Sequence, residues 1–163
     1  EELSIRDTQV EAAVKLIDEG NTIPFIARYR KEVTGNLSDE LLRELDERLR
    51  YLRNLETRKE DVIKSIRELS QQVMPIGTQV ILFGSQARND AHSKSDWDVL
   101  ILLNKRERAN NQDFDDVAFP LIELGWEIGA MINPIVYSLD DWKRREFTPF
   151  YKNVKQDGIL LWH

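Results

Sequence analysis

Leu82-Phe-Gly-Ser-Gln-Ala-Arg88 and Ser95-Asp-Trp-Asp-Val-Leu-Ile101 are the two stretches that decide the fold of this 163-residue chain. A β-branched, apolar run at residues 79–83 leads into the first stretch and predicts a buried strand that ends at Gly84. Gly84 and Ser85 then precede a short helical start at residues 86–88. A strand that enters Gly-Ser at a helix start offers free backbone N–H groups to an anion, and Ser85 adds a hydroxyl donor.

Asp96 and Asp98 begin a second predicted strand, residues 96–103. Because side chains alternate along a strand, both carboxylates point to the same face. Two neighbouring carboxylates on an apolar strand repel each other and lose hydration, and a hard divalent cation with oxygen ligands would compensate. The alternative is an exposed strand start whose two aspartates simply face solvent. Trp97 points to the opposite face, where we expect it to pack in the core.

Taken together, Gly84-Ser85, a ten-residue spacer and Asp96-x-Asp98 resemble the signature of the minimal nucleotidyltransferases, in the superfamily of polymerase beta. The resemblance covers roughly residues 63–163. It implies that Gly84 and Ser85 hold the phosphates of a nucleoside triphosphate, and that Asp96 and Asp98 are catalytic ligands of Mg²⁺. Arg88 would either contact the nucleotide phosphates or pair with Asp90 or Asp96.

One position departs from the family pattern. Active members supply a third carboxylate from the following strand, which we expect to be antiparallel, and here Asn133 stands at that place. A neutral amide can ligate a metal but accepts no proton at neutral pH. Glu127, near the expected start of that strand, would be a substitute if the strand bends there. Pro134 predicts a bulge or an edge position for this strand.

The front of the chain reads as helix. Apolar residues at spacings of three and four predict one helix over residues 10–17, and a second helix, capped by Ser38, that spans roughly 35 residues if it is unbroken. Residues 11–66, centred on Thr22-Ile-Pro-Phe-Ile-Ala-Arg-Tyr-Arg-Lys-Glu-Val-Thr-Gly35, resemble the helical N-terminal region of the transcription accessory protein Tex. The leucine stripe of the long helix predicts a helix-packing face or, as the alternative, a self-association surface.

The expected fold class is therefore α+β. A helical segment, residues 1–62, runs through one long helix into a small nucleotidyltransferase domain, residues 63–163, with a mixed sheet and flanking helices. The two patterns merge inside that helix. Either a natural fusion or an engineered chimera would explain why the two patterns occur in one chain.

The charge and composition of the chain limit the kinds of partner that it is expected to bind. The net charge of −6 divides evenly, −3 in residues 1–70 and −3 in the rest, so neither half has the basic excess of a nucleic-acid-binding domain. The chain contains no cysteine, which excludes disulfides and thiolate metal sites. Since no apolar run is long enough to span a membrane and no signal peptide is evident, we expect a cytoplasmic protein.

Three functions are consistent with these features. The first is Mg²⁺-dependent transfer of a nucleoside monophosphate, AMP from ATP, to a hydroxyl acceptor. The resemblance favours a protein acceptor, in particular a HEPN-type toxin for which the chain would be the antitoxin, over an aminoglycoside. The second is a nucleotide- or partner-binding module in which Asn133 has removed turnover. The third is a fusion scaffold without an acceptor.

Overall fold

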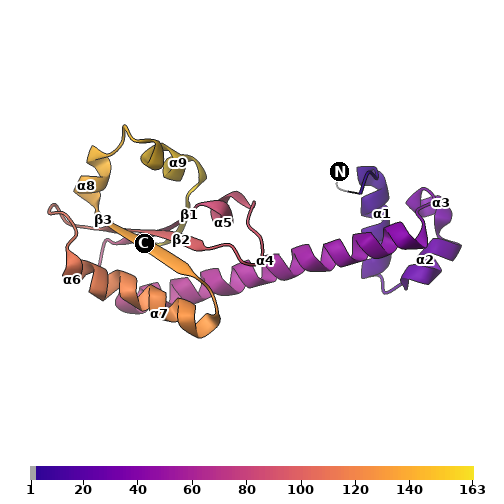
Figure 1. Cartoon of the computed structure of the whole chain (residues 1–163), viewed down its shortest axis with the longest axis horizontal. Coiled ribbons are helices and arrows are strands. Elements are labelled where there is room, and N and C mark those ends of the chain that lie inside the picture. The colour runs from indigo at the N-terminus through magenta and orange to yellow at the C-terminus, as the bar shows by residue number, and fades with distance from the viewer. Residues whose placement is uncertain (1–2) are drawn as a thin grey trace. The chain divides into compact units, whose positions relative to one another are not determined.

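The computed structural model describes residues 3–163, which divide into two compact units at Glu56 and Thr57. The long helix α4 (Asp39–Val73) supplies residues to both units and is unbroken over 35 residues (Figure 1). Each unit has its own hydrophobic core. No helix in residues 3–163 is long and apolar enough to cross a membrane.

The first unit is entirely helical. Its elements are α1 (Asp7–Asp18), α2 (Ile23–Tyr29), α3 (Lys31–Thr34) and the first part of α4. Thr22 caps α2, because its hydroxyl accepts a hydrogen bond from the Phe25 amide, and Ser38 caps α4 in the same way at Leu41. The core of this unit consists of Ala13, Leu16, Ile26, Leu37, Leu42 and Leu45.

The second unit is built on a four-stranded mixed sheet with strand order β3-β2-β1-β4. The strands are β1 (Gln79–Phe83), β2 (Trp97–Leu103), β3 (Ile132–Ser138) and β4 (Ile159–Trp162). Strand β1 pairs antiparallel with both β2 and β4, whereas β2 pairs parallel with β3. The fold is therefore the expected α+β arrangement of helices around a small mixed sheet.

Helices cover both faces of this sheet (Figure 1). They are α5 (Ser85–Arg88), α6 (Asn111–Asp113), the π-helix η1 (Phe114–Ala118), α7 (Phe119–Ile128), α8 (Leu139–Arg144) and α9 (Pro149–Asp157). One face packs against α7 and the second part of α4, where Val62 and Ile66 are fully buried. The opposite face packs against α8 and α9 through an aromatic cluster centred on Trp142. Burial of an aliphatic side chain such as Val62 or Ile66 contributes about 1.5–3 kcal/mol to the stability of the fold.

The expected antiparallel pairing of β3 is wrong. The α6–η1–α7 segment lies between β2 and β3 and returns the chain to the starting end of β2, so the next strand runs parallel. The expectation for Pro134 is confirmed in one of its two forms. It lies on β3, which is an edge strand, and an edge strand is where a sheet tolerates a proline.

Candidate active site

Gly84 forms the sharp turn between β1 and α5. Its backbone has φ +73° and ψ −157°, in the region that favours glycine. A Cβ atom at this position would lie 2.4 Å from Oδ2 of Asp98, so the carboxylate packs directly against the glycine backbone. The turn therefore brings the Gly84-Ser85 motif and the second aspartate of the Asp-x-Asp motif into contact.

The register of the sheet explains this contact. Asp98 lies on the central strand β2, between Phe83 of β1 and Asn133 of β3. Asp96 precedes β2 by one residue and is exposed, whereas Asp98 is half-buried. Asp98 lies on the same face of the sheet as Asp96, because the two residues are two positions apart. Trp97, between them, points to the other face and is 5% exposed in the core.

Asn133 completes the cluster from β3. Its side-chain Nδ2 donates a hydrogen bond to Oδ2 of Asp96 over 3.1 Å. The amide therefore occupies the place beside both aspartates at which a third carboxylate was expected. Glu127 does not lie on the strand: it is exposed in the last turn of α7, five residues before β3 begins, so β3 does not bend to include it.

Burial raises the pKa of the Asp98 carboxyl. The side-chain amide of Asn133, which also lies beside Asp98, opposes this shift, the negative charge of Asp96 adds to it, and the positive charge of Arg88 lowers the pKa again. The net direction is upward from 3.8, because half-burial beside a second carboxylate disfavours the ionised form. The site thus has a shortage of positive charge at neutral pH, which a divalent cation would supply.

Ser85 and Arg88 lie at the two ends of the short helix α5. Ser85 is half-buried next to the Gly84 turn. Arg88 is exposed, and its Nε pairs with Oδ2 of Asp90 at 3.2 Å. Of the alternatives for Arg88, the structure records the pair with Asp90. The exposed guanidinium of Arg88 lies near enough to Asp98 to lower the pKa of that carboxyl.

Two polar residues that the sequence did not single out support the site. Nζ of Lys59, on α4, donates to Oδ1 of Asn89 over 2.6 Å, and Asn89 closes α5 in a left-handed conformation with φ +60°. Gln86 is buried, and its Nε2 donates to the carbonyl of Ser95 over 3.4 Å. These contacts tie α5 to α4 and to the residue before Asp96. Their partners are distant in sequence, so no local pattern indicates them.

The residues present are compatible with a divalent cation that the substrate phosphates help to bind. No group of three or more His, Cys, Asp or Glu side chains in residues 3–163 is arranged to hold a metal alone. Asp96 and Asp98 offer carboxylate oxygens, and Asn133 offers an amide oxygen. Mg²⁺ typically binds through one or two carboxylates plus phosphate oxygens and water, and this donor set fits that chemistry.

The half-buried carboxylate of Asp98 predicts that Asp98→Asn stabilises the metal-free protein. Because the folded-state pKa lies above the unfolded value, folding stability is highest below the unfolded pKa of 3.8 and falls as the pH rises through the folded-state pKa. Solvent screening keeps the effect small. In EDTA at pH 7 we expect a rise in Tm of roughly 1–4 °C for the variant. The difference should vanish near pH 3.5, whereas the exposed Asp61→Asn should leave Tm unchanged at either pH. An equal or lower Tm for Asp98→Asn at pH 7 would contradict this reading.

A glycine turn against an Asp-x-Asp strand in a small mixed sheet defines a class of protein. Residues 59–157 match the family described as Nucleotidyltransferase domain, and the chain belongs to that family. The "Putative protein adenylyltransferase MJ0604" of Methanocaldococcus jannaschii is 34% identical over 84 residues, which cover 52% of this chain and 77% of that protein.

The first part of the chain matches a second family. Residues 1–67 match the Tex-like protein N-terminal domain. The "Transcriptional accessory protein Tex" of Neisseria gonorrhoeae is 60% identical over 68 residues, which cover 42% of this chain. "Protein YhgF" of Escherichia coli (strain K12) is 42% identical over 127 residues, or 77% of this chain. The chain spans only 9% of the length of the former and 15% of the latter.

Proposed function

We propose that this chain transfers AMP from ATP to a hydroxyl group of an acceptor protein. The observation that carries the proposal is the packing of the Asp98 carboxylate against the Gly84 backbone, with Asp96 and Asn133 beside it. This arrangement combines a turn that a phosphate can approach closely with paired carboxylates that need a cation. The membership of the nucleotidyltransferase family supports the type of reaction.

In the proposed mechanism, the residues position the substrate. The backbone of Gly84 and Ser85 and the Ser85 hydroxyl hold the β- and γ-phosphates of ATP. Mg²⁺, held by Asp96 and Asp98, would neutralise charge on the phosphate oxygens. The oxygen of the acceptor hydroxyl attacks the α-phosphorus and gives up its proton to solvent water, while the bond from the α-phosphorus to the α,β-bridging oxygen breaks and pyrophosphate leaves. Since phosphoryl transfer depends mainly on positioning and charge stabilisation, an amide at residue 133 is compatible with turnover.

A protein is the acceptor class that we propose. Support comes from the relative in Methanocaldococcus jannaschii, which is named a putative protein adenylyltransferase. The first acceptor to test is a HEPN-type toxin, with this chain as its antitoxin. The Tex-like unit contributes no residue to the glycine turn or to the Asp-x-Asp strand, all of which lie in residues 57–163.

Label transfer tests the reaction directly. The protein is incubated with Mg²⁺, the acceptor and ATP labelled at either the α- or the γ-phosphorus. We expect the α-label on the acceptor and the γ-label in released pyrophosphate. Transfer of the γ-label would show a kinase instead, and binding of ATP without transfer of either label would leave the proposed activity contradicted for that acceptor.

Asn133 favours a second candidate function, a module that binds nucleotide without turnover. Its side chain stands beside both aspartates but offers no carboxylate. The protein would then retain Mg²⁺-dependent affinity for ATP and lack transfer. ATP affinity together with label transfer therefore separates the two candidates.

Asn133→Asp tests the importance of the missing carboxylate. We expect transfer to rise by about 100-fold, the lower end of the roughly 10²–10⁴-fold that one positioned acid–base group typically contributes. Because three carboxylates then repel one another, Tm should fall in EDTA and recover when Mg²⁺ is added. Asn133→Gln, which keeps the amide, is the control and should show neither effect. A variant that neither gains activity nor responds to Mg²⁺ would show that residue 133 does not face the reacting centre.

A further inference from the structure

The end of α5 is held by backbone hydrogen bonds that converge on the Gly84–Ser85 turn. The amide of Asn89, which ends α5 with φ +60°, donates to the carbonyl of Ser85, and the amide of Asp90 donates to the same carbonyl over 3.2 Å. The amide of Arg88 donates to the carbonyl of Gly84 over 3.2 Å. A left-handed backbone is uncommon for a residue with a side chain, so the placement of Ser85 depends on what holds Asn89 in this conformation.

Lys59 of α4 supplies that restraint. Its Nζ donates to Oδ1 of Asn89 over 2.6 Å, and the lysine is half-buried, whereas Asn89 is exposed. The side chain of Asn89 therefore binds α4 while its backbone amide binds the carbonyl of Ser85. The lysine thus reaches the Gly84–Ser85 turn through one intervening residue.

Arg58, the preceding residue of α4, holds a second segment that supports the site. Its Nη2 donates to the carbonyl of Ile128 at the end of α7. The chain then leads to Met131, directly before β3, whose carbonyl accepts a hydrogen bond from the amide of Trp97 over 2.8 Å. Because Trp97 lies between the two aspartates, this segment positions the strand of the Asp-x-Asp motif.

We propose that Lys59 and Arg58 are positioning residues of the nucleotide site, an inference that rests on the function proposed above. Lys59 holds the Gly84–Ser85 turn through Asn89, and Arg58 holds the strand of the Asp-x-Asp motif through the end of α7. Adjacent residues of one rigid helix thereby fix the two halves of the site relative to each other. Such support matters because a small displacement of the groups that bind a substrate weakens binding strongly.

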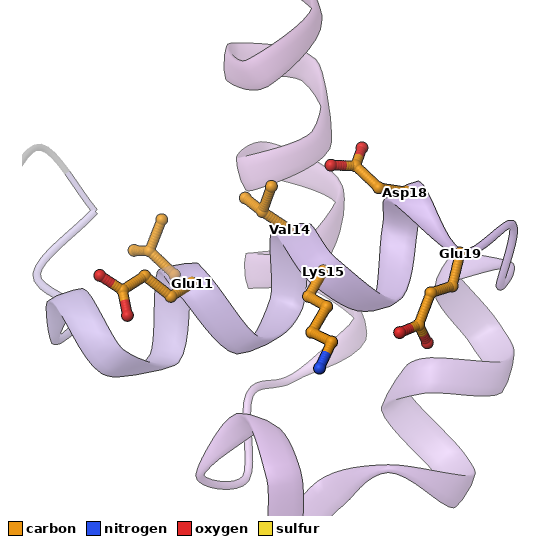
Figure 2. Close-up of a pocket in the computed structure, with 6 residues that line it drawn as sticks. Glu11, Val14, Lys15, Asp18 and Glu19 are labelled. Carbon is orange, nitrogen blue, oxygen red and sulfur yellow. The ribbon is translucent and has the colours of Figure 1, made fainter.

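Amide hydrogen exchange in EDTA tests the first step without any ligand. Lys59→Met removes the donor, and we expect the amides of Asn89 and Asp90 to exchange about fivefold faster, the change that loss of one exposed hydrogen bond gives. Lys59→Arg retains a donor and should restore slow exchange. The matched control is Arg53→Met, because Arg53 also extends from α4 but pairs over 2.8 and 3.0 Å with Asp18, which lines a shallow hollow on α1 (Figure 2). Unchanged exchange in Lys59→Met, or an equal increase in the control, would overturn the proposal.

Calorimetric titration with ATP at saturating Mg²⁺ tests whether this restraint serves the site. Lys59→Met should raise Kd about fivefold, and Asn89→Gly, which keeps the left-handed turn but removes the acceptor, should do the same. Because the lysine acts through Asn89, the double variant should bind no more weakly than either single variant. Effects that multiply, or an unchanged Kd for Lys59→Met, would overturn the inference alone. Absence of binding by the unmodified chain would overturn the proposed function, and this inference with it.

Arg58→Met tests the second contact through the dependence of ATP binding on the metal. Since Arg58 supports the strand that carries both carboxylates, the Mg²⁺ concentration for half-maximal binding should rise about fivefold, with a smaller change in Kd at saturating Mg²⁺. Lys59→Met should show the reverse pattern, because it loosens the turn and not the strand. Helical circular dichroism confirms that both variants are folded. The same pattern in both variants would show a general loosening of the domain and would contradict the two separate roles.

Discussion

Gly84→Ala is expected to lower the affinity for Mg²⁺-ATP at least tenfold and to lower Tm by several degrees. Two effects act together. A residue with a Cβ atom at φ +73° has left-handed backbone strain of about 1–2 kcal/mol. The same Cβ would stand 2.4 Å from Oδ2 of Asp98, so the carboxylate must move away from the turn that we propose to bind the phosphates. Calorimetric titration gives the affinity, and thermal unfolding gives the stability.

Gly20→Ala is the matched control for this prediction. Gly20 has φ +91°, but a Cβ atom there meets no atom within 4 Å. The control therefore carries backbone strain without displacing a site residue, and we expect a lower Tm with unchanged ATP affinity. If Gly84→Ala binds ATP as the unmodified protein does, the contact between the turn and Asp98 is not part of a nucleotide site.

The second large effect is expected from Asp96→Asn combined with Asp98→Asn. This change removes both carboxylates while it preserves the size of the side chains. We expect label transfer from ATP to fall by about 1,000-fold or more, because the positive charge that would stabilise the transferring phosphate is no longer held in place. The metal-free protein should be at least as stable as before, since the repulsion between Asp96 and a half-buried Asp98 is also removed.

The combination of higher stability and lost activity identifies a functional site rather than a structural one. A pair of aspartates that stabilised the fold would give the opposite result, a lower Tm on substitution. Asp61→Asn, an exposed change on α4, controls for a general loss of negative charge and should alter neither quantity. Retained transfer by the double variant would exclude both residues from the reaction.

Local patterns predicted the elements that carry the site. The apolar run before Gly84 is β1, the stretch after Asp96 is β2, and the long helix is unbroken over 35 residues. Each of these features depends on residues within a few positions of one another, so sequence alone contains the necessary information.

Features that depend on long-range packing were not predicted. The parallel direction of β3 follows from the α6–η1–α7 segment that precedes it, and it leaves Glu127 on a helix. The contact between Lys59 and Asn89 joins residues thirty positions apart. The 48% exposure of Leu52, between the partly buried Leu49 and Leu55, depends on which residues pack against α4 and not on the spacing of the leucines.

The central claim, a Mg²⁺-dependent nucleotide site built from Gly84, Asp96 and Asp98, is tested most directly by titrating the unmodified chain with ATP in the presence and absence of Mg²⁺. With Mg²⁺ we expect a Kd near 100 µM, about −5.5 kcal/mol. Without the metal, or with the double variant Asp96→Asn/Asp98→Asn, binding should weaken at least tenfold. Binding that is absent under all conditions, or equally strong with and without Mg²⁺ and both aspartates, would contradict the account.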